Sequence, residues 1–207
     1  DAAEWTSLDF HKCTHCPLNS ADSPQCPAAT SLVDIVDCFA HIRSYDDIDV
    51  TIRMPQRNVQ ASVKADAGAR SLMGLLMASS GCPHLSFFRP MARFHIPFAD
   101  GEETMFRMVA SYFLSTYLHH QKSGQPLDSK HLDKHIQDLN KRISTLNRAF
   151  IERLLAASKT DTNLNALAEL DVLVMSLPDS IEDMTSTLEP LCHDYLELIQ
   201  SDSQQDG

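Results

Sequence analysis

The chain has 207 residues, of which 43% are apolar and 22% are charged, and its formal net charge is −11. This composition supplies enough apolar residues for a packed globular core. The acidic balance disfavours proteins that grip nucleic-acid backbones or anionic membrane surfaces, since both depend on clustered Lys and Arg. No apolar run approaches the roughly 18 residues that a membrane-spanning helix needs, and no basic-then-apolar leader opens the chain. We therefore expect a cytoplasmic protein.

The first 30 residues form an irregular segment with three cysteines and three prolines. Cys13, Cys16 and Cys26 give a Cys-x2-Cys-x9-Cys pattern, in which the close pair can direct two thiolates at one ion. Few apolar residues are present to offset the entropy of ordering this loop, whereas a bound metal contributes folding free energy directly. The pattern therefore predicts a metal-bound segment over residues 1–30, against the alternative of three unligated thiols in a flexible leader.

Apolar residues at helical spacing predict a helix over residues 28–43, in which Cys38 is expected to be a small buried residue. Alternating apolar and polar residues in IDVTIRM, and again over 58–64, predict a β-hairpin within about 46–64. Two strands alone are marginal in water. The hairpin is therefore expected to pack on helices or to join further strands.

The chain after the hairpin is predicted to be almost entirely helical. Helices are expected over residues 67–79, 101–121, 129–158, 161–176, 179–187 and 189–200. Asp100 is placed to cap the second of these helices, and Glu102 and Glu103 complement its N-terminal dipole. The fold class is therefore mainly α, a multi-helix domain over 31–200 with a small antiparallel hairpin. The polar tail at 201–207 lacks apolar anchors and is expected to be disordered.

Three cysteine ligands require a fourth, and Cys82 is the first choice. It follows a predicted helix in the turn SSGCPH, and, like Cys16 and Cys26, it is followed by proline. The alternatives are three histidines close to a predicted ligand in sequence, His11, His15 and His84. The two remaining cysteines lie in helical patterns and are interpreted as structural.

The identity of the centre is less defined than its ligands. Four Cys or Cys/His ligands typically hold structural zinc, but zinc knuckles usually place a small residue after the second cysteine, where this chain has Pro17. Proline after a ligating cysteine is typical of iron–sulfur motifs, and the string CTHCPL resembles the opening of the iron–sulfur uracil-DNA glycosylases. The two alternatives for this one site are an iron–sulfur cluster of the 4Fe–4S type and structural zinc, and the prolines favour iron–sulfur. The Cys-Pro pairs of haem-regulatory motifs give a third, weaker option.

A second candidate site lies in FFRPMARFHIPF, where Arg89, Arg93 and His95 stand close together in an acidic chain. These side chains can form an anion or ligand site beside the metal centre. The structural alternative, which we favour, is that the arginines pair with local carboxylates and the phenylalanines fill the core. His131 and His135 share a helix face but lack the HExxH arrangement. No catalytic motif indicates a reaction.

Several longer motifs together resemble a bacterial protein family of unknown function. They are EWTSLDFHKCTHCPL, QCPAA, SLMGLLMASSGCPHL, RPMARFHIPFADGEETMFRMVASYFL and DTNLNALAELD, and they spread over about residues 4–195. The resemblance implies that Cys13, Cys16, Cys26 and Cys82 form one set, since the family shares the CxxCPL, the later CP and the SGCP. It also implies a strand-rich segment before the Trp-Thr motif that would complete the sheet. It implies no reaction.

The sequence thus predicts a metal-binding protein with a cysteine-ligated centre that senses redox state or iron. One alternative is a zinc-stabilised helical module, in which the metal is inert and a helix face binds another protein. Another is an enzyme that acts near Arg89, Arg93 and His95. A protein partner fits the first two functions, whereas nucleic acid and membranes are not expected partners.

Overall fold

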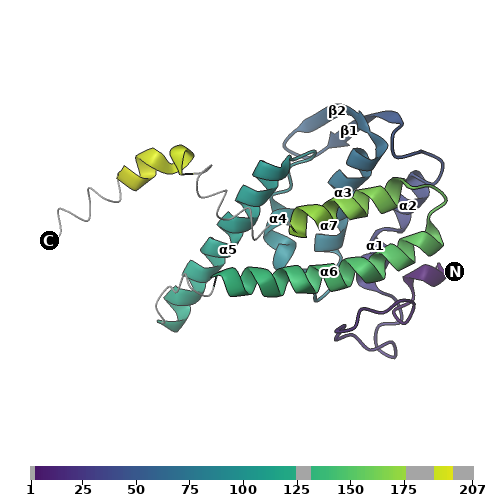
Figure 1. The fold of residues 1–207 in the computed structure, drawn as a ribbon, viewed down its shortest axis with the longest axis horizontal. Helices are drawn as coiled ribbons and strands as arrows, with labels where there is room; N and C mark the ends of the chain where they lie inside the picture. Colours follow the sequence, from purple (N-terminus) through teal and green to yellow (C-terminus); the bar gives the residue numbers. More distant parts are fainter. Residues whose placement is uncertain (1–2, 125–131, 176–188, 198–207) are drawn as a thin grey trace.

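The computed structural model describes residues 3–124, 132–175 and 189–197 (Figure 1). Its elements in chain order are η1 (Glu4–Thr6), α1 (Pro27–Ser31), α2 (Val33–Cys38), β1 (Asp47–Arg53), β2 (Asn58–Lys64), α3 (Ala65–Ser79), η2 (Ser86–Phe88), α4 (Arg89–Arg93), α5 (Gly101–Ser123), α6 (Leu132–Ala157), α7 (Thr162–Met175) and η4 (Pro190–Cys192). The prediction of a mainly helical fold with one antiparallel hairpin is confirmed.

The helix predicted over 28–43 is broken into two short helices at Leu32. The backbone of Leu32 has φ −96° and ψ −4°, and its N–H donates to the Ala29 carbonyl at 3.0 Å, which closes a tighter turn than that of an α-helix. The hydroxyl of Ser31 donates to the Ala28 carbonyl at 2.8 Å. Such side-chain bonds compete with the helical ladder, and the apolar spacing alone gave no sign of them.

The expectation that Cys38 is buried is wrong. It is the last residue of α2 and its side chain is exposed. Ile35 and Val36 carry the buried face of this short helix, and Phe39 fills the core after the chain leaves it.

The hairpin is formed as predicted and rests on α3. β1 and β2 pair in antiparallel register with Asp47 opposite Lys64, and exposed and half-buried residues alternate along both strands. A Cβ added at Gly68 of α3 would lie 2.9 Å from the Ile48 side chain. Glycine at this position therefore lets the helix approach the sheet closely.

Helix α3 is the central element of the fold. It packs against α7, α7 packs against α6, and the hairpin and α4 contact α3 as well. Ala69 and Met73 of α3 share one buried core with Phe150 and Leu154 of α6 and Leu167 of α7. In Figure 1 the hairpin lies at the top of the molecule, and the N-terminal segment lies at the lower right beside the end of α6.

Helix α5 begins with the cap that the sequence predicts. The Asp100 carboxylate accepts the Glu103 N–H at 2.8 Å, and the Glu103 carboxylate accepts the Asp100 N–H at 3.1 Å. This reciprocal pair is a capping box. The helix ends at Gly124, whose φ of +67° favours glycine.

Two predicted segments, the helix at 179–187 and the tail at 201–207, lie outside the described residues. Within 189–200, residues 193–197 are helical. In the described part of the chain, no helix is both long and apolar enough to cross a bilayer.

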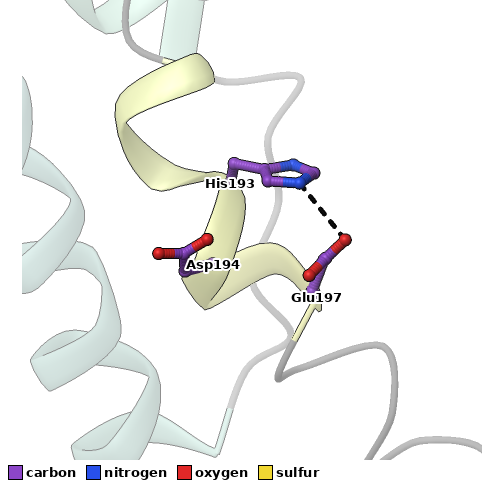
Figure 2. Close-up of side chains that lie close together, drawn as sticks. All are labelled: His193, Asp194 and Glu197. Carbon is purple, nitrogen blue, oxygen red and sulfur yellow. Dashed lines mark ion pairs between the residues drawn. The ribbon is translucent and has the colours of Figure 1, made fainter.

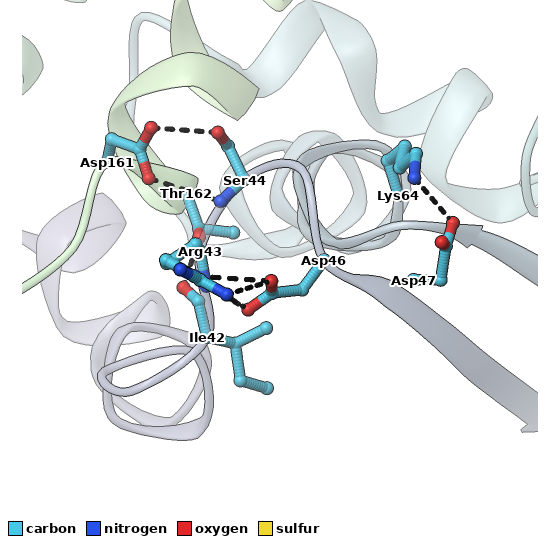
Figure 3. A network of polar contacts seen from close by, with 8 residues as sticks. All are labelled: Ile42, Arg43, Ser44, Asp46, Asp47, Lys64, Asp161 and Thr162. Carbon is cyan, nitrogen blue, oxygen red and sulfur yellow. Dashed lines mark hydrogen bonds and ion pairs between the residues drawn. The ribbon is translucent and has the colours of Figure 1, made fainter.

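A polar network joins the loop after α2 to the start of α7 (Figure 3). The Asp161 carboxylate accepts the Ser44 N–H at 3.1 Å and the Ser44 hydroxyl at 2.8 Å. The Thr162 hydroxyl donates to the Ile42 carbonyl at 2.5 Å. These bonds between residues about 120 positions apart fix the loop that leads into the hairpin, and the hydrogen bonds from Ser44 lower the pKa of Asp161.

The Asp161 carboxylate is expected to make stability dependent on pH. Because its folded-state pKa is lowered, its contribution is present above about pH 4 and is lost as the pH falls through the lower folded value. Asp161→Asn should therefore reduce the free energy of unfolding at pH 7, and the difference from wild type should shrink toward pH 2. Urea unfolding at several pH values measures this. Asp37→Asn, at an exposed position of α2, is the control, and an Asp161→Asn deficit that persisted at pH 2 would contradict the assignment.

Two glycines of α3 are expected to respond differently to alanine. A Cβ at Gly74 meets its nearest neighbour, Leu170, at an ordinary 3.8 Å, whereas a Cβ at Gly68 meets Ile48 at 2.9 Å. Gly74→Ala should stabilise the protein by about 0.5–1 kcal/mol, because helix propensity improves without a clash. Gly68→Ala should gain less or lose stability, because the hairpin must shift. Thermal unfolding of both variants tests this, and an equal gain at Gly68 would refute the close-approach argument.

Candidate metal centre

The structure brings together the four cysteines that the sequence groups. Burial, and to a smaller extent the neighbouring thiols of Cys26, Cys16 and Cys82 in that order, raise the pKa of the Cys13 thiol to about 11. Cys26 and Cys16 also act on Cys82. Cys26 and Cys82 belong to the buried core, and Cys13 and Cys16 pack against it. Four thiols from separate parts of the chain thus share one partly buried region.

The Cys26 arm is fastened to η1 by backbone bonds. The Cys26 N–H donates to the Thr6 carbonyl at 2.8 Å, and the Leu8 N–H donates to the Pro24 carbonyl at 2.9 Å. Ser7 and Gln25 form an isolated antiparallel bridge between the same two stretches. Cys26 is also the N-cap residue of α1, directly before Pro27. The third cysteine of the pattern is therefore held in place by the ordered backbone around it.

The pair Cys13 and Cys16 lies on a tight turn between these fastened ends. The Cys16 N–H donates to the Cys13 carbonyl at 3.0 Å, so the two residues sit at opposite ends of one turn, as the Cys-x2-Cys spacing predicts. Both side chains are half-buried. They form the side of the cysteine group nearer to solvent, whereas Cys26 and Cys82 form its inner side.

Cys82 lies in the turn that ends α3. Gly81 has a φ of +84°, a left-handed conformation that turns the chain after the helix. Burial raises the pKa of Cys82, and the backbone N–H groups of His84 and Leu85 oppose that shift. The Leu85 N–H itself donates to the Cys82 carbonyl at 3.1 Å, which closes the turn.

A buried arginine from α6 lies against this region. Arg153 is 1% exposed, and its guanidinium donates to the carbonyls of Trp5 at 2.7 Å, Ser7 at 2.8 Å and Leu8 at 3.2 Å. Its charge lowers the pKa of Cys13, against the larger effect of burial. Among the residues that the structure describes, no carboxylate forms an ion pair with it. A buried cation of this kind is costly without a negative partner.

The sequence analysis did not identify Arg153. The feature of the sequence that could have identified it is a charged residue on an apolar helix face, between Phe150 and Leu154, both of which are fully buried. Long charged residues are almost never fully buried unless they are paired. A charge at a core position of a predicted helix is therefore a usable sign of a buried partner, although it does not identify that partner.

The sulfur atoms are spread more widely than ligands around one small ion. In the described part of the chain, the single group of three or more potential ligands whose atoms all lie within 4.8 Å of one another is His193, Asp194 and Glu197. The four cysteines do not form such a group. Sulfurs in a tetrahedral site with bonds of 2.3 Å would be about 3.8 Å apart.

The group at residues 193–197 does not need an ion to explain it (Figure 2). The imidazole of His193 lies 3.2 Å from the Glu197 carboxylate, one helical turn away, and both side chains are about two-thirds exposed. Pairs at this spacing stabilise exposed helices by themselves. Exposed acidic residues alone do not define a metal site, and we assign no function to this group.

The three histidines considered as alternative ligands differ in position. The Nε2 atom of His84 lies 2.8 Å from the His15 carbonyl oxygen and so ties the Cys82 turn to the Cys13–Cys16 turn. His11 and His15 are exposed, and His11 has a φ of +42°. His84 thus joins the Cys82 turn to the Cys13–Cys16 turn, whereas His11 and His15 are exposed.

The second candidate site is not gathered in the way the sequence reading proposed. His95 lines a cavity beside α3, and its Nε2 atom bonds to the Ser71 carbonyl at 2.8 Å. Arg89 and Arg93 are exposed and do not line that cavity, and the Arg93 guanidinium lies over the Phe94 ring, 5.6 Å from its centroid. An anion site shared by these three residues stays a prediction without geometric support. His131 and the side chain of His135 lie outside the described residues.

The comparisons with known proteins give a family and no activity. A family model described as a domain of unknown function (DUF6901) matches residues 1–193. The chain belongs to this family. No curated protein and no solved structure matches the chain. Membership of a family without assigned activity is what the shared motifs predicted, and the function must therefore be argued from the site.

Removing Arg153 is expected to release the N-terminal segment. Arg153→Met should lower the free energy of unfolding by about 2–4 kcal/mol, because three buried carbonyls lose a charged donor. Amide hydrogen exchange should rise at residues 5–8 and around Cys26 more than in the hairpin. Arg148→Met, at an exposed position of the same helix, is the matched control. Unchanged exchange at residues 5–8 would show that Arg153 does not hold this segment.

Proposed function

We propose that Cys13, Cys16, Cys26 and Cys82 bind one iron–sulfur cluster, and that this cytoplasmic protein uses it to sense redox state or iron. The observation that carries the proposal is the grouping of four thiols, with a buried arginine acting on one of them, Cys13. These thiols come from an irregular N-terminal segment and from the turn after α3.

The buried charge of Arg153 favours metal-bound thiolates in this region. Burial and the neighbouring thiols raise the pKa of Cys13 to about 11, so its free thiol stays protonated at neutral pH. A metal core replaces these protons, because metal binding releases them from its ligands. Four thiolates around such a core leave a net negative charge, and the guanidinium of Arg153 is the buried positive charge that complements it.

The spacing of the sulfurs supports a cluster more than a single ion. Zinc would require them to close to about 3.8 Å, and among the described residues they do not form a group within 4.8 Å of one another. A cluster of several irons holds its cysteines around a larger core. The proline after each of Cys16, Cys26 and Cys82 also fits iron–sulfur motifs.

A sensing role is supported by the loop between Leu8 and Pro24, whose order would depend on the bound cluster. Cys13 and Cys16 lie on the half-exposed side, where an oxidant reaches the cluster first. Between Leu8 and Pro24 the chain forms no helix or strand, and few apolar residues hold it. Loss of the cluster would therefore free this loop while α3, α6 and α7 keep their own packing, and a change in iron or redox state becomes a change in order at one surface.

A second candidate function is a zinc-stabilised interaction module, and one feature favours it. Helix α5 contacts α4 but exposes large apolar side chains along much of its length. They are Phe106, Phe113, Leu114, Tyr117 and Leu118, each at least 49% exposed. An apolar helix face of this kind is typical of surfaces that bind another protein. In this function the metal is inert and serves stability.

Anaerobic purification and elemental analysis test the proposal. The protein should be brown and contain iron and acid-labile sulfide. Cys82→Ser should lose most of the iron, because it removes one of four ligands, whereas Cys38→Ser should keep it, because Cys38 is exposed and outside the group. A colourless protein with one zinc per chain would replace the first function with the second. Full iron retention in Cys82→Ser would move the fourth ligand to His11, His15 or His84.

A further inference from the structure

A large cavity on the other side of α3 lies outside the proposed metal function. It has a volume of about 740 Å³ and is lined by residues of α3, α4, α5, α6 and α7. Well-packed interiors contain few voids larger than a water molecule, whereas small-molecule sites occupy about 300–1,000 Å³. The cavity therefore has the size of a ligand site rather than that of a packing defect.

Most of the cavity wall is apolar, and its charged groups are few. Leu75, Met91, Met108 and Leu170 represent the apolar part. The charged residues that line it are Arg70, Asp100, Arg107 and Glu169. Two arginines and two carboxylates balance in formal charge, so a multiply charged anion gains no net attraction from the wall. An apolar body with one charge fits this lining.

Three of these four charges already have partners. Arg70 and Glu169 form an ion pair with each other. Asp100 is engaged in the capping box of α5, where its carboxylate accepts the Glu103 N–H at 2.8 Å. Among the described residues, Arg107 is the lining charge that is engaged in neither an ion pair nor a helix cap, and the nearby Glu103 carboxylate acts on it from outside the lining.

Arg107 has weak contacts and lies in a desolvated place. Its Nε and Nη1 atoms donate to the carbonyls of Glu103 and Phe94, both at 3.3 Å, and Nη2 lies 3.4 Å from the Thr104 hydroxyl. In the described chain no carboxylate forms an ion pair with it. Burial lowers the pKa of Arg107, and the same cause lowers that of His95, which the Arg107 charge lowers further. A half-buried cation with long bonds to neutral acceptors is suited to a carboxylate, which accepts two parallel N–H bonds.

Ser71 of α3 holds the loop that forms one wall of the cavity. Its carbonyl bonds to His95 Nε2 at 2.8 Å, and its hydroxyl accepts the Phe98 N–H at 2.9 Å. Phe98 has a φ of +59°, a left-handed conformation that is strained for a bulky residue. Such a conformation persists only where neighbouring groups hold it. Here the two hydrogen bonds to Ser71 hold the loop, and with it this wall of the cavity.

We propose that this cavity binds a small amphipathic monocarboxylate, with Arg107 holding the carboxylate and the apolar wall enclosing the hydrocarbon body. A free phosphate or another dianion is disfavoured by Glu169 and Asp100. The ligand site is independent of the metal centre, because none of the four cysteines lines the cavity.

Calorimetric titration of the full-length protein with dodecanoate tests the proposal, with dodecanol as the neutral probe of the same length. Dodecanoate should bind at one site per chain, and dodecanol should bind at least tenfold more weakly. Arg107→Gln should weaken dodecanoate binding about ten- to hundredfold, because a charge-assisted bond is lost, and should leave dodecanol binding unchanged. Arg57→Gln, at an exposed position of the hairpin turn, should leave both unchanged.

A variant that fills the cavity separates this site from other binding. Gly74 lines the cavity, and a Cβ atom added there has Leu170 as its nearest neighbour, at 3.8 Å. Gly74→Leu should abolish binding of both probes while circular dichroism shows an intact helical fold. No binding of dodecanoate to the wild type, equal binding of both probes, equal loss in Arg57→Gln and Arg107→Gln, or full binding in a folded Gly74→Leu would each overturn the proposal.

Discussion

The guanidinium of Arg153 joins helix α6 to the N-terminal segment, and the position of that segment depends on this contact. It extends from α6 into the protein and donates to three carbonyls between Trp5 and Leu8. Those residues are in turn bonded to the stretch that ends at Cys26. This side chain adds to the apolar contacts of Leu8 and Cys26, which also belong to the core, in holding the irregular segment on the helices. The same side chain supplies a positive charge where thiols gather, so one residue serves both the fold and the electrostatics of the candidate centre.

Helix α3 divides the molecule into regions with separate chemistry. Its first turns support the hairpin through Gly68, and its last turn leads through Gly81 into Cys82. The side chains of its middle, together with α7 and α5, form a wall of the apolar cavity. Because one rigid helix carries all three features, each can keep its geometry while a loop on another side changes. Leu85 links two of these regions, since it lines the cavity and its N–H donates to the Cys82 carbonyl at 3.1 Å.

The features that the sequence predicted are mainly those determined by interactions between residues close together in the chain. The hairpin, the capping box at Asp100 and the boundaries of α3 follow from spacing and end signals within a few residues, and they were predicted. The grouping of Cys82 with the N-terminal cysteines followed from a repeated Cys-Pro pattern. The break at Leu32, the exposure of Cys38 and the contacts of Arg153 depend on side-chain bonds or on partners far along the chain. The cavity could not be predicted at all, because no local pattern records what five helices leave unfilled between them.

The contact between Arg153 and the residues near Trp5 also sets an order for assembly in the cell. The bonded residues are separated by 145 to 148 positions, so during synthesis the N-terminal segment leaves the ribosome long before its arginine partner. Contacts of such long range form late, after their loop has closed, and domains fold as their residues emerge. The cysteine loop is therefore open to solvent through most of translation. Its closure awaits the emergence of α6, so the path of this segment is fixed only after most of the described chain has been made.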